Sequence, residues 1–393
     1  MQPIAVKGQK GVVLTDPLGI SQQSLFIPGS LVLLLSLMDG TRESSALKTA
    51  FELRTGMTLN DSNLQLLVSE LDGALFLENE RFNRAYKVVL DNYRSATSRP
   101  LVLKEKCYPT NPEELNVYLQ RYFDQLTGDT LKDGSELKAM ICPHIDFERG
   151  GHIYAEVWSK AKEAIQETEL FIILGTDHHE AKGRVTLTRQ DYQTPWGIIP
   201  TAQDVVGELV NEIGDDAAFT CELNHRGEHS VEFALIWLHY LLGEKKCQIV
   251  PVLCGSFQPF IERGESPAKA SHIAATVEVL RQICERRRTI IVAAADLAHM
   301  GPVFGDLAPL DLIGRKRMTK QDEALVNIIG RGNAEDFYVE ILKEKDRRHV
   351  CGLPPIYIAL SVLSGIEGRQ AGYALCPAST DGTSQVSICG MLF

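Results

Sequence analysis

The sequence predicts an α/β protein in which residues 100–393 form a mainly parallel sheet with helices on both faces, preceded by a small α+β module over residues 1–99. From residue 138 onward, short apolar runs rich in β-branched residues alternate with longer segments of helical periodicity, the pattern of a parallel sheet covered by helices. Three of these runs are followed closely by a histidine. The stretch SATSRP, Ser95 to Pro100, has the composition of a linker and separates the two parts.

The N-terminal module is predicted to contain short helices and one strand. Ser30 is a suitable N-cap for the first helix. The expected elements are the helices Leu31–Met38, Glu43–Arg54, Asn60–Asp72 and Arg81–Arg94, and the strand Ala74–Leu77. Three short helices followed by a strand pair or turn favour a winged-helix-like module. A helical packing domain is the alternative.

The charge distribution argues against nucleic acid and membrane partners. The formal net charge is -11, and the third helix has no lysine or arginine between Asn60 and Asp72, where a DNA-reading helix would be basic. We therefore expect this module to contact a protein or peptide. The longest apolar stretch, Leu31–Met38, is too short to span a bilayer.

The nine cysteines are scattered and include no C-x-x-C pair, which is typical of a reducing compartment rather than of a disulfide scaffold. The N-terminus shows no export signal, so we expect a cytoplasmic protein.

The larger domain is predicted from the alternation of its segments. Asn111 followed by Pro112 and two glutamates marks a helix start. Helices are expected at Pro112–Leu126, Gly150–Ile165, Ala202–Ile213, His229–Leu242, Ser271–Arg286, Lys316–Ile329, Ala334–Lys343 and Pro355–Leu363. Strands are expected at Lys138–Pro143, Glu169–Leu174, Arg184–Leu187, Gln248–Leu253, Thr289–Ala295, Gln370–Leu375 and Gln385–Cys389.

Histidines follow three of the strand-like runs. His144 follows Pro143, His178 and His179 follow the run that ends at Gly175, and Asp296 and His299 follow the run 289–295. A single histidine near an apolar segment is more often a core or capping residue. Three parallel strands that end alike would instead bring imidazoles to one edge of the sheet, and histidine is the commonest metal ligand. This pattern favours a shared metal or catalytic site.

Two further segments carry candidate site residues. Glu228 and His229 precede an apolar helix and are either an ordinary helix start or an acid–base pair at the same cleft. Cys351 stands at the start of another helix. Most lone cysteines are inert, but a helix N-terminus favours the thiolate, which is a soft metal ligand.

Residues from about 103 to 393 resemble the Memo family, called AmmeMemoRadiSam system protein B in prokaryotes. The motifs that carry the resemblance are Cys107-Tyr-Pro, Pro143-His-Ile-Asp-Phe, Ile173-Leu-Gly-Thr-Asp-His-His, Tyr192-Gln-Thr-Pro-Trp-Gly, Glu228-His-Ser-Val-Glu, Ile249-Val-Pro-Val, Ala295-Asp-Leu-Ala-His and Cys351-Gly. The family is similar in fold to the class III extradiol dioxygenases (LigB-like), which hold non-haem iron. The N-terminal module also resembles winged-helix domains of the PqqD type that hold peptides.

The resemblance implies a metal site made of His144, His178, His299 and Cys351, all of which this chain retains. Asp146 and Phe147 stand where relatives have glycine and tyrosine, and Ala298 and Pro354 also depart from the usual pattern. These departures concern the lining of the pocket rather than the implied ligands.

The expected function is that of a non-haem redox enzyme, dioxygenase-like, with iron or copper and with zinc as an alternative metal. His299 or His179 would transfer protons, and Asp296 or Glu228 would orient an imidazole. The substrate is expected to be a small molecule or peptide, and the family name implies AMMECR-like and radical SAM partners. A non-enzymatic metal-binding adaptor and a zinc hydrolase are the alternatives.

Overall fold

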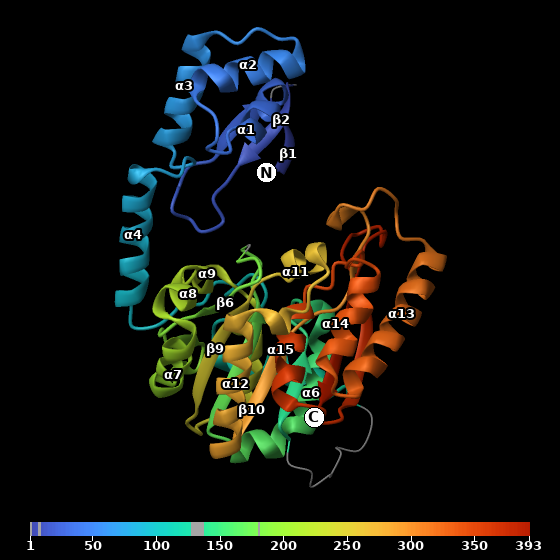
Figure 1. Ribbon diagram of the computed structural model, residues 1–393. Coiled ribbons are helices and arrows are strands. Elements are labelled where there is room, and N and C mark those ends of the chain that lie inside the picture. Colours follow the sequence, from blue (N-terminus) through green and yellow to red (C-terminus); the bar gives the residue numbers. More distant parts are fainter. Residues whose placement is uncertain (1, 7–8, 127–136, 180) are drawn as a thin grey trace. The chain divides into compact units, whose positions relative to one another are not determined.

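The computed structural model describes residues 2–6, 9–126, 137–179 and 181–393. The chain forms two compact units, Met1–Ser95 and Ala96–Phe393 (Figure 1). The boundary falls at the start of the predicted linker. Arg99, placed at the end of the first module by the sequence, belongs to the larger unit, where its side chain is buried. None of the helices in the described part of the chain is long and apolar enough to cross a membrane.

The first unit begins with an antiparallel sheet that the sequence pattern did not predict. Its strands pair in the order β1-β2-β3. They are β1 (Gln2–Val6), β2 (Gln9–Leu14) and β3 (Leu25–Pro28), followed by a 3-10 turn, η1 (Gly29–Leu31), and by the helices α1 (Val32–Leu37), α2 (Ser44–Thr55), α3 (Asp61–Gly73) and α4 (Glu80–Ser95). The four predicted helices are thus present, and Leu34, Phe51 and Leu64 are among the side chains of the unit's own core.

The predicted strand Ala74–Leu77 is wrong, because these residues form a turn at the end of α3. The backbone N–H of Ala74 donates to the carbonyl of Glu70, and that of Phe76 donates to the carbonyl of Leu71. The backbone donors that a strand would use are therefore spent on closing the helix. Phe76 and Leu77 pack against the core of the unit from this turn, which explains why the run is apolar.

The larger unit is built on an eight-stranded sheet whose centre is parallel. The strand order is β11-β13-β4-β10-β5-β9-β6, with β12 paired to β13. The four central strands, β4, β10, β5 and β9, run parallel, and the flanking strands run antiparallel. The strands are β4 (Ala139–Cys142), β5 (Leu170–Thr176), β6 (Val185–Leu187), β9 (Gln248–Cys254), β10 (Thr289–Ala294), β11 (His299–Met300), β12 (Arg369–Pro377) and β13 (Gln385–Leu392).

Helices cover both faces of this sheet, as the sequence predicted. Side chains along the central strands alternate between two cores: Phe171 and Ile173 join one, and Ile172 and Leu174 join the other. The first core contains side chains from α5 (Pro112–Phe123), α6 (Phe147–Glu167) and α10 (Ser230–Leu242). The second contains side chains from α7 (Gln203–Ile213), α12 (Ser271–Arg286), α13 (Leu312–Gly330), α14 (Ala334–Lys343) and α15 (Leu353–Leu363).

Several short elements were not predicted. They are the hairpin strands β7 (Tyr192–Thr194) and β8 (Gly197–Ile199), the helices α8 (Asp215–Phe219), α9 (Asn224–Gly227) and α11 (Gln258–Arg263), and the 3-10 turns η2 (Pro267–Lys269) and η3 (Pro302–Phe304). Each is too short to show a clear hydrophobic period. Some of them nevertheless border the site described next, because they join the ends of the long elements.

Candidate metal centre

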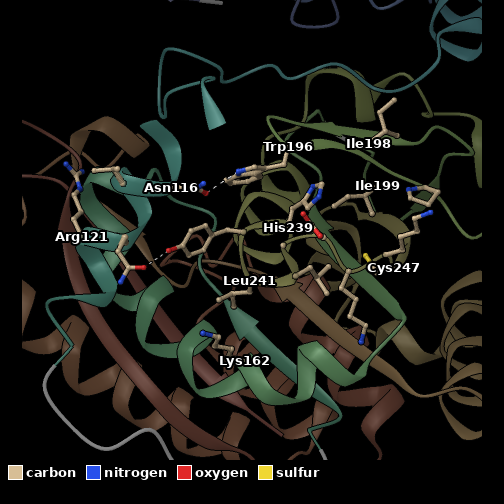
Figure 2. A pocket seen from close by; sticks show the side chains of 18 of the residues that line it. Asn116, Arg121, Lys162, Trp196, Ile198, Ile199, His239, Leu241 and Cys247 are labelled. Carbon is tan, nitrogen blue, oxygen red and sulfur yellow. Dashed lines mark hydrogen bonds between the residues drawn. The ribbon is translucent and has the colours of Figure 1, made fainter. Parts of the chain in front are cut away.

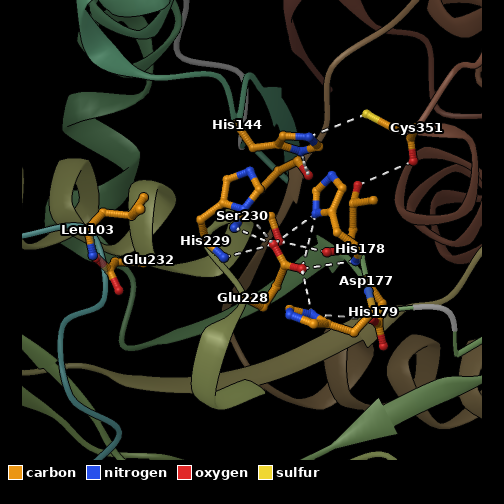
Figure 3. Close-up of polar contacts among 12 residues, drawn as sticks. Leu103, His144, Asp177, His178, His179, Glu228, His229, Ser230, Glu232 and Cys351 are labelled. Carbon is orange, nitrogen blue, oxygen red and sulfur yellow. Dashed lines mark hydrogen bonds and ion pairs between the residues drawn. The ribbon is translucent and has the colours of Figure 1, made fainter. Parts of the chain in front are cut away.

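Side chains from separate loops meet beyond the carboxyl ends of the parallel strands. His144 follows β4, His178 follows β5, and Cys351 lies between α14 and α15. These three residues offer ligand atoms that lie within 4.8 Å of one another (Figure 3). Since β4 and β5 both neighbour β10 and run parallel to it, the loops that follow them emerge at one edge of the sheet. The strand order thus explains how His144 and His178 come together.

The imidazole of His144 is held in one orientation. Its Nδ1 lies 2.9 Å from the carbonyl oxygen of Ala294, which can only accept, so Nδ1 carries the proton and Nε2 is left as the ligand atom. Nε2 lies 3.3 Å from the sulfur of Cys351. Burial, together with the nearby charge of His178, lowers the pKa of His144 to about 4. The ring is therefore neutral at physiological pH, as a metal ligand must be.

His178 is oriented by the carboxylate of Glu228. Its Nδ1 lies 3.0 and 3.1 Å from the two carboxylate oxygens. Burial alone would lower the pKa of His178, but the hydrogen bond and negative charge of Glu228 raise it above its usual value. This carboxylate–histidine contact is the arrangement that fixes the tautomer of metal-bound histidines and leaves Nε2 for the metal.

Glu228 is fully occupied by hydrogen bonds. Its buried carboxylate also accepts from the backbone N–H groups of His178, His229 and Ser230, at 3.0, 2.8 and 2.9 Å. Burial would raise the pKa of Glu228, but these bonds and the charges of His178 and His229 lower it well below its usual value. A carboxylate held ionised in this way orients His178. It is poorly suited to the proton transfer that the sequence left open for it.

Cys351 is placed by a close approach of the backbone at Gly352. The N–H of Gly352 donates to the carbonyl of Asp296 at 3.0 Å, and a Cβ at Gly352 would lie only 2.3 Å from that oxygen. Only glycine fits there, which accounts for the Cys-Gly pair. Burial and the negative charge of Asp296 raise the pKa of the Cys351 thiol well above 9.0. The expectation that a helix N-terminus would favour the thiolate is therefore wrong for the metal-free chain, although a bound cation would reverse the balance.

His299 lies beside this cluster. It begins β11, its Nδ1 is 3.2 Å from the carbonyl oxygen of Leu297, and its ring packs against Phe304. Among the described residues, the groups of ligand atoms within 4.8 Å of one another do not include it. Burial lowers the pKa of His299 to about 4, and Asp296 and His144 act on it electrostatically.

The ring of His229 lies beside the rings of His144 and His178, in addition to neighbouring Glu228 as the predicted acid–base pair. Its ring centroid is 4.7 Å from that of His178 and 5.6 Å from that of His144. It forms a second group of ligand atoms with His178 and Glu228. Burial lowers its pKa to about 4, although 34% of the side chain is exposed. His229 is thus available either as a further ligand or as a neutral base.

The other sequence candidates surround these rings. Asp296 is buried, its carboxylate accepts from the N–H of His144 at 2.8 Å, and burial raises its pKa. His179 lies on the far side of Glu228 (Figure 3), and its buried Nδ1 has no hydrogen-bond partner within the described chain. Asp177 completes a third group of ligand atoms with His179 and Glu228. Sequence reasoning missed Asp177, although it directly precedes the histidine pair.

The family model for Memo-like proteins matches residues 99–392. The chain belongs to the Memo-like family. A MEMO1 family protein of Aquifex aeolicus (strain VF5) is 26% identical over 388 residues, which cover 97% of this chain and 95% of that protein. MEMO1 family proteins of Thermus thermophilus and Methanopyrus kandleri are 24% and 26% identical, over 72% and 71% of this chain and 78% and 92% of their own lengths. The Aquifex match is long enough to include most of the N-terminal unit.

A buried arginine links the first residues of the Memo-like region to the loop that carries Glu228. The guanidinium of Arg99 pairs with the carboxylate of Glu232 and donates to the carbonyls of His225 and Glu228. The same Glu232 carboxylate accepts from the backbone N–H groups of Val102 and Leu103 and from the hydroxyl of Tyr108. The sequence placed Arg99 in a linker and gave no sign of its partner Glu232.

The Memo-like unit has two cavities of interest, and they differ in whether residues of the metal centre line them. One of about 590 Å³ is lined by His178 and Cys351 and so opens onto the cluster. A larger one of about 1330 Å³, lined by Trp196, His239 and Tyr240 among others, lies at the C-terminal end of α10 (Figure 2). The 13 residues of α10 span roughly 20 Å, and the cluster adjoins its N-terminal end. The smaller cavity is the one that can serve the metal centre.

Proposed function

We propose that this Memo-like protein is a metal-dependent oxidoreductase of the dioxygenase type, with iron or copper bound by His144, His178 and Cys351. The donor set carries the proposal, because one sulfur and two imidazoles offer ligand atoms within 4.8 Å of one another. Both rings use Nδ1 for a fixed hydrogen bond, which leaves Nε2 for a metal. A thiolate with imidazoles suits iron, copper or zinc better than magnesium or calcium.

The roles of the surrounding residues follow from their contacts. A bound redox metal would supply electron transfer and polarise the substrate. Glu228 holds His178 in its ligand orientation, and Asp296 fixes the backbone of His144. Burial lowers the pKa of His229 and of His299 to about 4, so both rings are neutral at physiological pH and would take up a substrate proton only as weak bases.

Access to the cluster comes from the side of His178 and His229. About a third of each of these side chains is exposed, at 35% and 34%, whereas His144 is only 2% exposed. A substrate would therefore approach the metal from the open side, opposite the buried ring. The proposal includes a small molecule or peptide as substrate and the AMMECR-like and radical SAM partners implied by the family resemblance.

Metal analysis of the full chain purified anaerobically, without added metal, tests the proposal. We expect about one equivalent of iron or copper that is lost in Cys351→Ser and His178→Ala. Dioxygen uptake with catechols is expected to require both residues. Cys284→Ser is the matched control, because Cys284 lies on α12 and joins none of the ligand groups among the described residues.

Zinc content with hydrolysis and no oxygen demand would replace the oxidoreductase assignment with the zinc hydrolase. Full metal content that persists in both site variants would refute the site itself.

A further inference from the structure

The cavity beside the cluster has the size of a small-molecule site. Its volume is about 590 Å³, and His178 and Cys351 form part of its wall. Small-molecule pockets commonly enclose about 300 to 1,000 Å³. The segment that runs from the end of α14 to Cys351 also lines the cavity, through residues 345–347 and 349–351. A ligand in this cavity would touch the two ligand-bearing loops and this segment at once.

The segment 345–349 is held in an unfavourable backbone conformation. Lys345, Asp346 and His349 all have positive φ, at 54°, 50° and 50°, which residues with a Cβ rarely adopt. Such conformations persist where the surroundings enforce them, and they cluster at functional sites. Within this segment Arg348 is buried, and its guanidinium anchors the segment by bonding to Asp322 and Glu344.

The conformation turns Arg348 inward and leaves its neighbours exposed along the cavity. The carbonyl of Arg348 also accepts from the N–H of His299 at 2.7 Å, which ties the segment to the start of β11. Lys345 and Arg347 on either side are exposed and line the cavity. The segment is therefore a fixed platform that presents two cationic side chains beside the cluster.

Neither of these two cations has a carboxylate partner among the residues that the structure describes. No ion pair or side-chain hydrogen bond of Lys345 or Arg347 occurs within the part of the chain that the structure describes. The carboxylates that line the cavity are already bound to backbone donors. Asp306 accepts from the N–H of Gly301 at 2.7 Å, Asp346 from that of Val350 at 2.8 Å and Asp177 from that of His179 at 2.8 Å. Within the described residues, the side chains of Lys345 and Arg347 therefore stay available to a bound anion.

We propose that this cavity binds a small organic anion, whose carboxylate or phosphate group is held by Lys345 and Arg347 and whose remainder extends towards Cys351 and His178. The planar guanidinium of arginine can donate to two oxygens of a carboxylate or of a phosphate at once, and lysine adds a mobile point charge. The use of the cavity as a substrate site rests on the proposed function. The binding of the anion does not, because neither cation is a candidate metal ligand.

Titration calorimetry of the full chain with succinate and with inorganic phosphate tests the proposal. Arg347→Ala is expected to weaken anion binding about tenfold, because it removes a charge-assisted hydrogen bond. Lys345→Ala is expected to weaken binding by a smaller factor for the same reason. Arg347→Lys is expected to restore part of the affinity. Lys343→Ala is the matched control, because Lys343 is exposed on α14 and already pairs with Glu340.

The two probes distinguish the head groups, since tighter binding of succinate indicates a carboxylate and tighter binding of phosphate indicates a phosphate ester. No saturable binding of either probe, or equal binding by Arg347→Ala and Lys343→Ala, would overturn the inference. His144→Ala separates it from the proposed function, because His144 is a candidate metal ligand that does not line the cavity, so this variant is expected to lose metal while it retains the probe. Anion binding without any metal content would leave this inference intact and defeat the oxidoreductase.

Discussion

Replacement of Glu228 by glutamine tests how the metal centre is oriented. One carboxylate oxygen accepts from Nδ1 of His178 at 3.0 Å and from the N–H groups of His229 and Ser230 at 2.8 and 2.9 Å. The other accepts from the N–H of His178 at 3.0 Å. The amide oxygen of glutamine can replace only one of these two carboxylate oxygens. Its NH₂ group must then face a backbone N–H, so at least one buried donor loses its acceptor.

The expected size of the effect follows from these contacts. Loss of a partner that orients a metal-bound histidine typically weakens metal binding about 10- to 100-fold, or roughly 1.4 to 2.7 kcal/mol. The buried donor left without an acceptor is expected to lower the free energy of unfolding by about 1 to 3 kcal/mol. The pKa of His178 is also expected to fall, because Glu228 is the group that raises it.

Competition with a chromophoric chelator measures the affinity, and thermal unfolding of the metal-free chain measures the stability. Glu167→Gln is the matched control, since Glu167 is 62% exposed and pairs with Arg288 on the surface. Its metal affinity is expected to equal that of the unaltered chain. If Glu228→Gln also retained full metal affinity, Glu228 would not orient a ligand and the geometric argument for the site would fail.

Three further results are expected. Metal affinity should rise about tenfold per pH unit near neutral pH, because the pKa of Cys351 is raised and its thiol must release a proton on binding; a pH series of chelator competitions measures the slope. Gly352→Ala should lose metal and unfold at lower temperature, because its Cβ would lie 2.3 Å from the carbonyl oxygen of Asp296; melting curves and metal analysis check this. Arg99→Met should destabilise the chain by about 3 to 5 kcal/mol, since it leaves the buried charge of Glu232 unpaired, as denaturant unfolding would show.

The sequence predicted those features of the fold that depend on local periodicity. The long helices and the central strands were found because each has a core-facing pattern of its own, as in the alternation of Phe171 to Leu174 between two cores. The approach of His144 to His178 followed from one topological rule about the ends of parallel strands. The choice of Cys351 rested on the family resemblance, because no local pattern separates a ligand from an inert cysteine.

The features that were missed depend on contacts between distant segments. Ala74–Leu77 has the composition of a strand, but its backbone donors close α3 instead. The pKa of the Cys351 thiol is raised by burial and by the charge of Asp296, and the position of Cys351 before a helix does not offset this. Arg99 lies in a stretch with linker composition, and its partner Glu232 is 133 residues away. Such pairs leave no periodic signal.

Buried arginines hold two of the loops that build the metal centre. Arg99 pairs with Glu232 behind the loop of Glu228, and Arg348 pairs with Asp322 behind Cys351. Since removing two charges from water costs about as much as their attraction returns, such pairs are weak contributors to net stability, and apolar replacements are often neutral. Stability alone therefore does not account for two of them beside one site. Arg99 also donates to the backbone carbonyl of Glu228, and the backbone carbonyl of Arg348 accepts from the N–H of His299. Each arginine therefore fixes one loop of the site. The geometry of the metal centre, more than the stability of the fold, is what these buried charges determine.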